Sequence, residues 1–153
     1  MEGNHVFQEH EAYCGPAVAQ MVLKRFGTEL TQQEIAKELE TDMVVGTSAR
    51  ELVSFFERRG FQVSRKNGAQ WKDVEQALAT SPVVIVEYLE LEEDIAHYTL
   101  VSTLREDAIV LNDPLFGAEY VLPKEIFLKR WLDDADKLCG DQLLLTVASP
   151  ARS

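Results

Sequence analysis

The spacing of hydrophobic residues changes character at Pro82, and this change limits the folds open to the chain. Before Pro82, apolar residues recur at helical spacing, as with Val18, Met21 and Val22 in the segment 16–26. After it come short runs rich in β-branched and aliphatic residues, which are typical of strands. Helices followed by strands indicate an α+β domain in which N-terminal helices pack on a mostly antiparallel C-terminal sheet.

Start and stop signals place the individual elements. Thr31 with Glu34, and Ser48 with Glu51, form capping-box patterns that open helices. A glycine closes the first and third helices, as expected for a left-handed C-terminal residue. We predict helices over 16–26, 31–39, 48–59, 71–79 and 123–132, strands over 61–66, 83–89, 97–104, 108–113 and 142–148, and a loose tail over 149–153.

Length and charge restrict the class of protein. The 153 residues, 46% of them hydrophobic, suit one globular domain spanning 1–153. The net charge of −11 opposes non-specific binding to nucleic acid. The longest apolar run, 82–86, is too short to cross a bilayer, and no basic segment followed by an apolar stretch opens the chain. We therefore expect a cytoplasmic protein without a membrane segment.

The two cysteines, Cys14 and Cys139, have different surroundings. Without a secretory signal both are expected to be free thiols. Cys139 lies beside a glycine, far from any chemical motif, and is interpreted as structural. The two cysteines and three histidines show no paired ligand spacing, so the sequence predicts neither a metal site nor a cofactor.

Cys14 stands directly before Gly15-Pro16, where a helix is expected to begin. The unpaired N–H groups and positive dipole end of that helix would favour thiolate over thiol. His97 and, sixteen residues later, Asp113 supply a base and a group to orient it. Gln8, six residues before Cys14, is a candidate amide donor to an oxyanion, together with the Cys14 backbone N–H.

Each of these residues also has a plainer interpretation. Cys14 could be a small buried hydrophobe, and Gln8 an exposed loop residue. His5 and His10 are competing bases, but His10 lies in an irregular segment before Cys14 without an evident carboxylate partner, and we interpret both as surface histidines.

The segments 97–104 and 108–113 predict an antiparallel hairpin that brings His97 to Asp113. A turn centred on Arg105 puts the two residues opposite each other, and a three-residue link, 105–107, makes them diagonal neighbours on one face. A register one residue off would put them on opposite faces. We therefore expect one of the first two registers.

The segment 89–94 places four acidic side chains shortly before His97: Glu90, Glu92, Glu93 and Asp94. A solvated loop is the first interpretation. The functional alternative is that this loop borders the cleft and attracts basic residues of a peptide.

With these residues in place, the sequence resembles the bacteriocin-processing peptidases, papain-like cysteine peptidases that trim double-glycine leader peptides, and their free-standing relatives. The likeness is carried by Gln8 and Cys14-Gly-Pro-Ala, by Gly46-Thr-Ser-Ala-Arg-Glu-Leu52 with Gly60-Phe61, and by His97-Tyr98 with Asn112-Asp113-Pro114. The resemblance implies a papain-like fold with a Cys-His-Asp triad and a glutamine oxyanion donor. Tyr13 departs from the family pattern, since many members carry an acidic or amide residue before the cysteine.

Three functions follow as hypotheses. The first is a peptidase that cleaves a peptide or protein substrate through a thioacyl-enzyme, with leader-peptide processing as one form of it. The second is a non-catalytic peptide-binding module of the same fold. The third is an acyltransferase that passes the same acyl group to an amine or thiol. The sequence leaves the substrate-binding residues and the oligomeric state open.

Overall fold

The computed structural model describes residues 4–131 and 142–149, and within them the chain is an α+β structure of five helices and six strands. The order along the chain is α1(Cys14–Arg25), α2(Gln32–Glu38), α3(Ala49–Arg58), β1(Gln62–Lys66), α4(Trp71–Thr80), β2(Val83–Leu89), β3(Ala96–Arg105), β4(Ala108–Asp113), β5(Gly117–Pro123), α5(Lys124–Arg130) and β6(Leu144–Ala148). The expected fold class and most expected elements are confirmed.

The capping signals work as the sequence indicates. The Thr31 side chain accepts from the backbone N–H of Glu34, and the Glu34 side chain accepts in return from the Thr31 N–H, so α2 has a complete capping box. At α3 the Ser48 side chain accepts from the Glu51 N–H. Helix α1 begins at Cys14, slightly earlier than expected, and thereby includes the thiol in its first turn.

All pairings in the six-stranded sheet are antiparallel, and the strand order is β1-β6-β2-β3-β4-β5. Strand β5, at one edge, was not expected. Its sequence signal is weak because it begins at Gly117 and ends at Pro123, two residue types that sequence patterns associate with turns. In the structure Gly117 and Glu119 both have positive φ, 111° and 56°. The predicted end of the last helix, Leu132, lies outside the described residues.

The β3–β4 hairpin differs from the expected turn but reaches the expected register. Its link has two residues, 106–107, instead of three. The two-residue link sets the register of the pairs at the tip. If that register continued unchanged to the base of the hairpin, His97 and Asp113 would lie on opposite faces of the sheet. A bulge between Val101 and Thr103 shifts the register, so Leu100 faces Asn112 and His97 lies diagonal to Asp113 on the same face.

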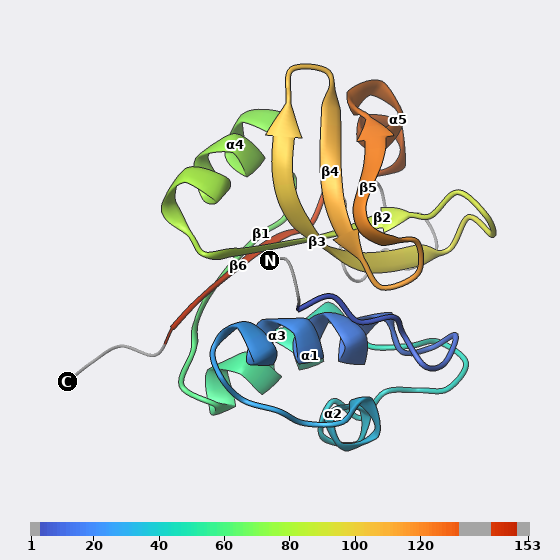
Figure 1. Ribbon diagram of the computed structural model, residues 1–153, viewed down its shortest axis with the longest axis vertical. Coiled ribbons are helices and arrows are strands. Elements are labelled where there is room, and N and C mark those ends of the chain that lie inside the picture. The colour runs from blue at the N-terminus through green and yellow to red at the C-terminus, as the bar shows by residue number, and fades with distance from the viewer. Residues whose placement is uncertain (1–3, 132–141, 150–153) are drawn as a thin grey trace.

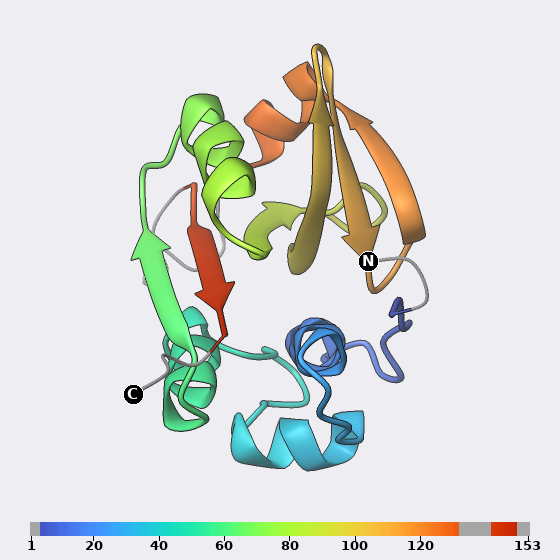
Figure 2. The same ribbon diagram turned by 60° about the vertical axis from the view of Figure 1, so that its left-hand side comes forward.

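Helices cover both faces of the sheet. Figures 1 and 2 show α1, α2 and α3 grouped below the sheet, while α4 and α5 lie beside its upper part. One core cluster joins α1 and α3 to residues such as Ile85, Tyr98 and Leu145. The other joins α4 and α5 to the opposite face, including Val86 and Tyr88. Helix α1, which carries Cys14, packs against β3, which carries His97.

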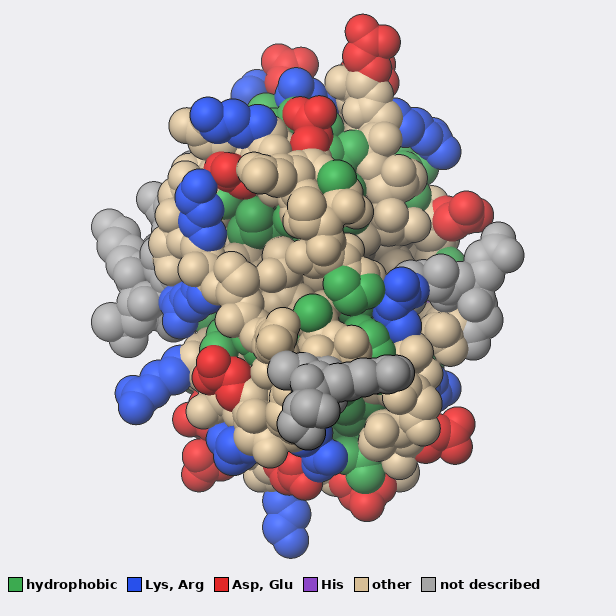
Figure 3. Space-filling view, turned by 90° about the vertical axis from the view of Figure 1, so that its left-hand side faces the viewer, with side chains coloured by type: hydrophobic (Ala, Val, Ile, Leu, Met, Phe, Trp, Pro, Cys, Tyr) green, Lys and Arg blue, Asp and Glu red, His purple; other side chains and the backbone are tan. Residues whose placement is uncertain are grey.

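Although acidic residues outnumber basic ones, the surface is not uniformly acidic. The face in Figure 3 has basic and acidic side chains interspersed. In the portion of the chain that the structure describes, no helix is both long enough and apolar enough to cross a bilayer.

Candidate active site

Cys14 is the first residue of α1 and a free thiol, 9% exposed. The next residue must be small because a Cβ at Gly15 would lie 2.6 Å from Thr47 Oγ1 and 2.7 Å from Thr47 Cβ. The segment before α3 therefore closes tightly on the start of α1. This close approach fixes the position from which the Cys14 side chain projects.

His97 and Asp113 form a buried pair. The imidazole Nε2 and the carboxylate Oδ1 are 2.8 Å apart, and the two residues are only 3% and 0% exposed. The backbone N–H groups of Leu115 and Phe116 also donate to Oδ1, at 2.8 and 3.1 Å. The turn that follows β4 thus holds the carboxylate in place for the imidazole, and the contact expected from the hairpin register is present.

Electrostatics favour the charged forms of this pair. Burial alone opposes a charged imidazole, but hydrogen bonds and charges from Asp113 and Cys14 outweigh it and raise the pKa of His97 to about 10. Burial likewise opposes the Asp113 carboxylate, yet the hydrogen bond and charge of His97, the Leu115 N–H and the Tyr88 hydroxyl hold the pKa of Asp113 below its usual range. Since Nε2 bonds to Asp113, Nδ1 is the nitrogen left to face Cys14.

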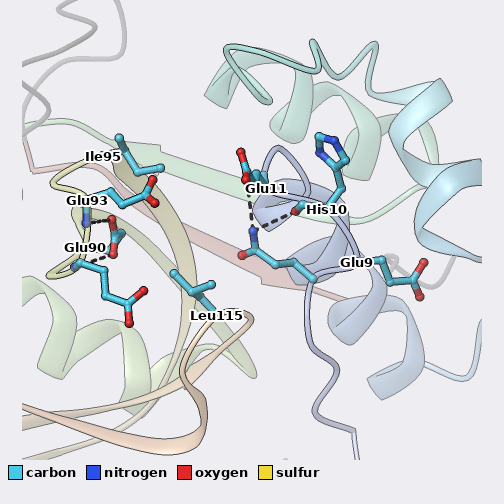
Figure 4. A pocket seen from close by; sticks show the side chains of 9 residues that line it. Glu9, His10, Glu11, Glu90, Glu93, Ile95 and Leu115 are labelled. Carbon is cyan, nitrogen blue, oxygen red and sulfur yellow. Dashed lines mark hydrogen bonds between the residues drawn. The ribbon is translucent and has the colours of Figure 1, made fainter.

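Gln8 lies in the segment before α1 and is tied to the site by its backbone, whose N–H donates to the Pro114 carbonyl at 2.8 Å. Its side-chain Nε2 donates to the carbonyls of His10 and Glu11, at 3.0 and 3.2 Å. Both N–H groups of the amide are therefore engaged in the turn before Cys14, as Figure 4 shows. Donation to an oxyanion requires one of them to exchange its partner.

The other two described histidines have separate roles. His10 is exposed, as expected, and its Nδ1 accepts from the Ala12 N–H at 3.0 Å. His5 is only partly exposed, and its Nε2 donates to the Asp113 backbone carbonyl at 2.8 Å, a bond that the interpretation as a surface histidine did not include. Proximity in sequence could not reveal this bond, since 108 positions separate the two residues.

Tyr88 is a site residue that the sequence interpretation missed. Its hydroxyl donates to Asp113 Oδ2 at 2.8 Å, and its ring lies edge-on to the His97 imidazole. A tyrosine inside an apolar strand gives no signal of such a contact. Only the pairing register of β2 with β3 brings it to the pair.

A cavity of about 560 Å³ lies beside Gln8. The turn before α1 forms one wall and the β2–β3 loop the other, with Leu115 between them (Figure 4). Glutamates are frequent in its lining, which consists of Gln8, Glu9, His10, Glu11, Glu90, Glu92, Glu93, Ile95 and Leu115.

The acidic side chains of the β2–β3 loop divide into structural and exposed ones. Glu90 is 1% exposed and accepts from the backbone N–H groups of Glu92 and Glu93, at 2.8 and 2.7 Å. Asp94 pairs with Arg130 at 2.6 Å. Glu92 and Glu93 themselves are exposed on the wall of the cavity.

The sequence predicts that Cys139 is a structural thiol and that the chain has no metal site. Cys139 lies outside the described residues. Over 4–131 and 142–149, no three histidine, cysteine or carboxylate side chains gather closely enough to hold a metal ion.

The model of the Peptidase C39 family matches residues 2–134. The lactococcin-G-processing and transport ATP-binding protein LagD of Lactococcus lactis subsp. lactis is 30% identical over 128 residues, which cover 82% of this chain and 17% of LagD. The chain thus spans about a sixth of that relative.

Two solved structures share the fold. The peptidase domain of Streptococcus ComA, a bifunctional ABC transporter involved in quorum sensing, aligns with a TM-score of 0.77 and 21% identity, covering 96% of this chain and 98% of that one. A double glycine motif protease from an AMS/PCAT transporter, solved with its leader peptide, aligns with a TM-score of 0.70 and 14% identity, covering 94% and 89%. With a family model that matches most of its length, the chain belongs to the Peptidase C39 family.

Proposed function

We propose that the protein is a cysteine peptidase in which Cys14 is the nucleophile, His97 the general acid and base, and Asp113 the residue that orients the imidazole. The observation that carries the proposal is the buried His97–Asp113 hydrogen bond of 2.8 Å beside a cysteine in the first turn of a helix. These residue types and this connectivity suit acyl transfer through a covalent intermediate.

The reaction proceeds in two halves. The Cys14 sulfur attacks the carbonyl carbon of the scissile bond, and the imidazolium of His97 gives its proton to the leaving amine as the C–N bond breaks. Water then attacks the thioester while His97 takes its proton, and the C–S bond breaks to return the thiolate and release the acid. Asp113 stabilises the imidazolium and holds its ring.

The developing oxyanion needs donors already in place. The N–H of Cys14 belongs to the first turn of α1, whose N–H groups have no acceptor within the helix. The amide of Gln8 is the second proposed donor, with one N–H released from the turn carbonyls when substrate binds. Replacing Gln8 by Ala is expected to lower kcat about 100-fold while KM changes little.

Alkylation separates this role of Gln8 from a purely structural one, because iodoacetamide reacts with the Cys14 sulfur without forming an oxyanion. If Gln8 only supports the turn before α1, Gln8→Ala should slow alkylation and turnover together. If it donates to the oxyanion, alkylation keeps its wild-type rate.

The substrate that we propose is a peptide with a double-glycine leader. LagD is a lactococcin-G-processing and transport protein, and the double glycine motif protease was solved with its leader peptide, which together support this choice. The exposed glutamates beside Gln8 add a preference for a basic side chain near the cleaved bond.

The first test uses thiol reactivity. Limited iodoacetamide at pH 6, followed by peptide mass spectrometry, should label Cys14 faster than Cys139. Cleavage of peptides that contain Gly-Gly should stop in Cys14→Ala, whose circular dichroism should match that of the wild type. Equal, slow labelling of both cysteines without cleavage would favour the peptide-binding module.

A second test distinguishes hydrolysis from transfer. Adding an amine nucleophile to the peptide digest yields the free acid if water is the acceptor and the amide if the amine is. Predominance of the amide at low amine concentration would identify an acyltransferase.

A further inference from the structure

A buried tyrosine on β2 contacts both members of the His97–Asp113 pair. Tyr88 faces His97 across the β2–β3 ladder, and the two ring centroids are 5.7 Å apart with planes at 76°. The Tyr88 hydroxyl extends to Asp113 Oδ2 at 2.8 Å. Side chains from three neighbouring strands therefore meet on one face of the sheet.

The carboxylate of Asp113 divides its hydrogen bonds between its two oxygens. Oδ1 accepts from the His97 ring and from the N–H groups of Leu115 and Phe116. Oδ2 accepts from Tyr88. Because Asp113 is 0% exposed, solvent does not replace a lost donor without rearrangement, and a buried carboxylate oxygen without its hydrogen bond is costly.

The direction of the Tyr88 bond is settled by its surroundings. Burial first, and then the neighbouring Asp113 carboxylate, raise the pKa of Tyr88 above its usual range. The phenol therefore keeps its proton throughout the working pH range and acts as donor. Asp113 correspondingly acts as acceptor, in its charged form.

We propose that Tyr88 is a positioning residue of the active site, an inference that rests on the peptidase function proposed above. Its hydroxyl fixes the rotation of the Asp113 carboxylate, so that Oδ1 stays directed at His97 Nε2 and the opposite ring nitrogen stays directed at Cys14. Tyr88 acts through Asp113 and does not itself give or take a proton in the reaction.

A packing role makes a different prediction. The Tyr88 ring also contacts Phe127, with centroids 6.4 Å apart. Phenylalanine would preserve that contact and the edge-on contact with His97, because it removes only the hydroxyl. Tyr88→Phe therefore separates the two roles.

The chain offers a matched control in Tyr120. Its ring stacks on Phe116 with centroids 4.7 Å apart, and Phe116 in turn contacts the His97 ring. Among the described residues, Asp113 acts on the Tyr120 hydroxyl through its charge and not through a hydrogen bond. Tyr120→Phe thus removes a phenol oxygen from the same neighbourhood without removing a donor to the carboxylate.

The experiment measures kcat and KM against pH for a fluorogenic peptide that ends in Gly-Gly, with wild type, Tyr88→Phe and Tyr120→Phe. Tyr88→Phe is expected to lower kcat about tenfold with KM nearly unchanged. The acid limb of its profile should move up by about one pH unit, because an Asp113 that has lost a donor takes up a proton more readily. Tyr120→Phe should retain the wild-type profile.

A second measurement does not require turnover. The ¹³C shift of the Asp113 carboxyl, followed against pH, should give a higher pKa in Tyr88→Phe than in wild type or Tyr120→Phe. If Tyr88→Phe does not fold, 3-fluorotyrosine at position 88, a stronger donor on the same skeleton, should shift the Asp113 pKa downward instead.

The outcomes are distinct. An unchanged Asp113 pKa and acid limb in Tyr88→Phe, or an equal shift in Tyr120→Phe, would overturn the positioning role. A wild-type protein that neither cleaves peptide nor alkylates at Cys14 would overturn the proposed function, while the carboxyl titration would still decide the role of Tyr88.

Discussion

His97 holds its proton more tightly in the folded chain than a histidine does in water. Its ring nitrogens are divided between a carboxylate and a thiol, in a site that is nearly closed to solvent. The same contacts that favour the charged imidazole therefore also contribute to folding.

This coupling predicts a pH-dependent stability. The pKa of His97 is about 10 in the folded protein, against an ordinary value of 6.5. The contribution is fully present below pH 6.5 and is lost as the pH rises toward 10, because the native state binds the proton that the unfolded chain has released. Urea unfolding at intervals from pH 6.5 to 10 should show the free energy of unfolding fall more steeply for wild type than for His97→Gln. Parallel curves for the two proteins would contradict the assignment.

At the scale of elements, the contact between α1 and the segment before α3 sets where the thiol lies. Gly15 and Thr47 approach so closely that a methyl group at position 15 overlaps the Thr47 side chain at both Oγ1 and Cβ. Thr47 is held from other directions, since its hydroxyl bonds to Thr41 and its carbonyl accepts from Tyr98. It is therefore poorly able to move aside.

We expect Gly15→Ala to lower the free energy of unfolding by about 1–3 kcal/mol and to slow peptide cleavage, because overpacking displaces the start of α1 from His97. Gly15→Ala combined with Thr47→Gly should recover both stability and rate, since both overlapping atoms are gone. Gly15→Ala with Thr47→Ala should recover less, because the Thr47 Cβ position at 2.7 Å remains occupied. A double-mutant cycle from urea unfolding and kcat measures the coupling, and additive effects would refute it.

Local signals predicted most elements, whereas long-range register decided the rest. The capping residues Thr31 and Ser48 act within one turn of helix, so a short window of sequence reveals them. The edge strand β5 carries turn-like residues and is held by pairing with β4, which no local pattern encodes. The bulge in β3 is likewise a property of two strands together.

The candidate site shows the same division. Cys14, His97 and Asp113 are recognisable by residue type and spacing, and the structure brings His97 and Asp113 together. Tyr88 and His5 reach Asp113 over 25 and 108 positions, through contacts that depend on how the sheet and the N-terminal segment are assembled. For Gln8, sequence suggests a donor but cannot reveal that the turn carbonyls already engage its amide.

On the scale of the whole molecule, Figure 2 shows the group of α1, α2 and α3 below the sheet, and the candidate site joins Cys14 at the start of α1 to His97 on β3 and Asp113 at the end of β4. The cavity beside this site has one wall from the turn before α1 and one from the β2–β3 loop. Its exposed glutamates come from both walls, Glu9 and Glu11 from one and Glu92 and Glu93 from the other. Together these four carboxylates favour the binding of a positively charged peptide.

Neutralising one wall should weaken the binding of basic peptides. Glu92→Gln with Glu93→Gln is expected to raise KM several-fold for peptides with Lys or Arg beside the double glycine and to leave neutral peptides unaffected. The difference should shrink between about 50 mM and 500 mM salt, because salt screens exposed charges. Glu75→Gln with Glu106→Gln removes the same charge from exposed positions on α4 and the hairpin turn, away from the cavity lining, and should change neither peptide class. Equal effects of the two double variants would indicate a general charge effect and no specific role of the cavity.

The bulge in β3 has a consequence for how this hairpin tolerates change in length. Because β3 has one residue more than β4 between the tip and the base, deleting a single β3 residue near the tip can remove the bulge while the pairing at the base keeps its register. Such a deletion near the tip therefore leaves the relative position of His97 and Asp113 unchanged. A sequence grafted into β3 near the tip can therefore be one residue shorter than the native segment before the orientation of His97 is disturbed.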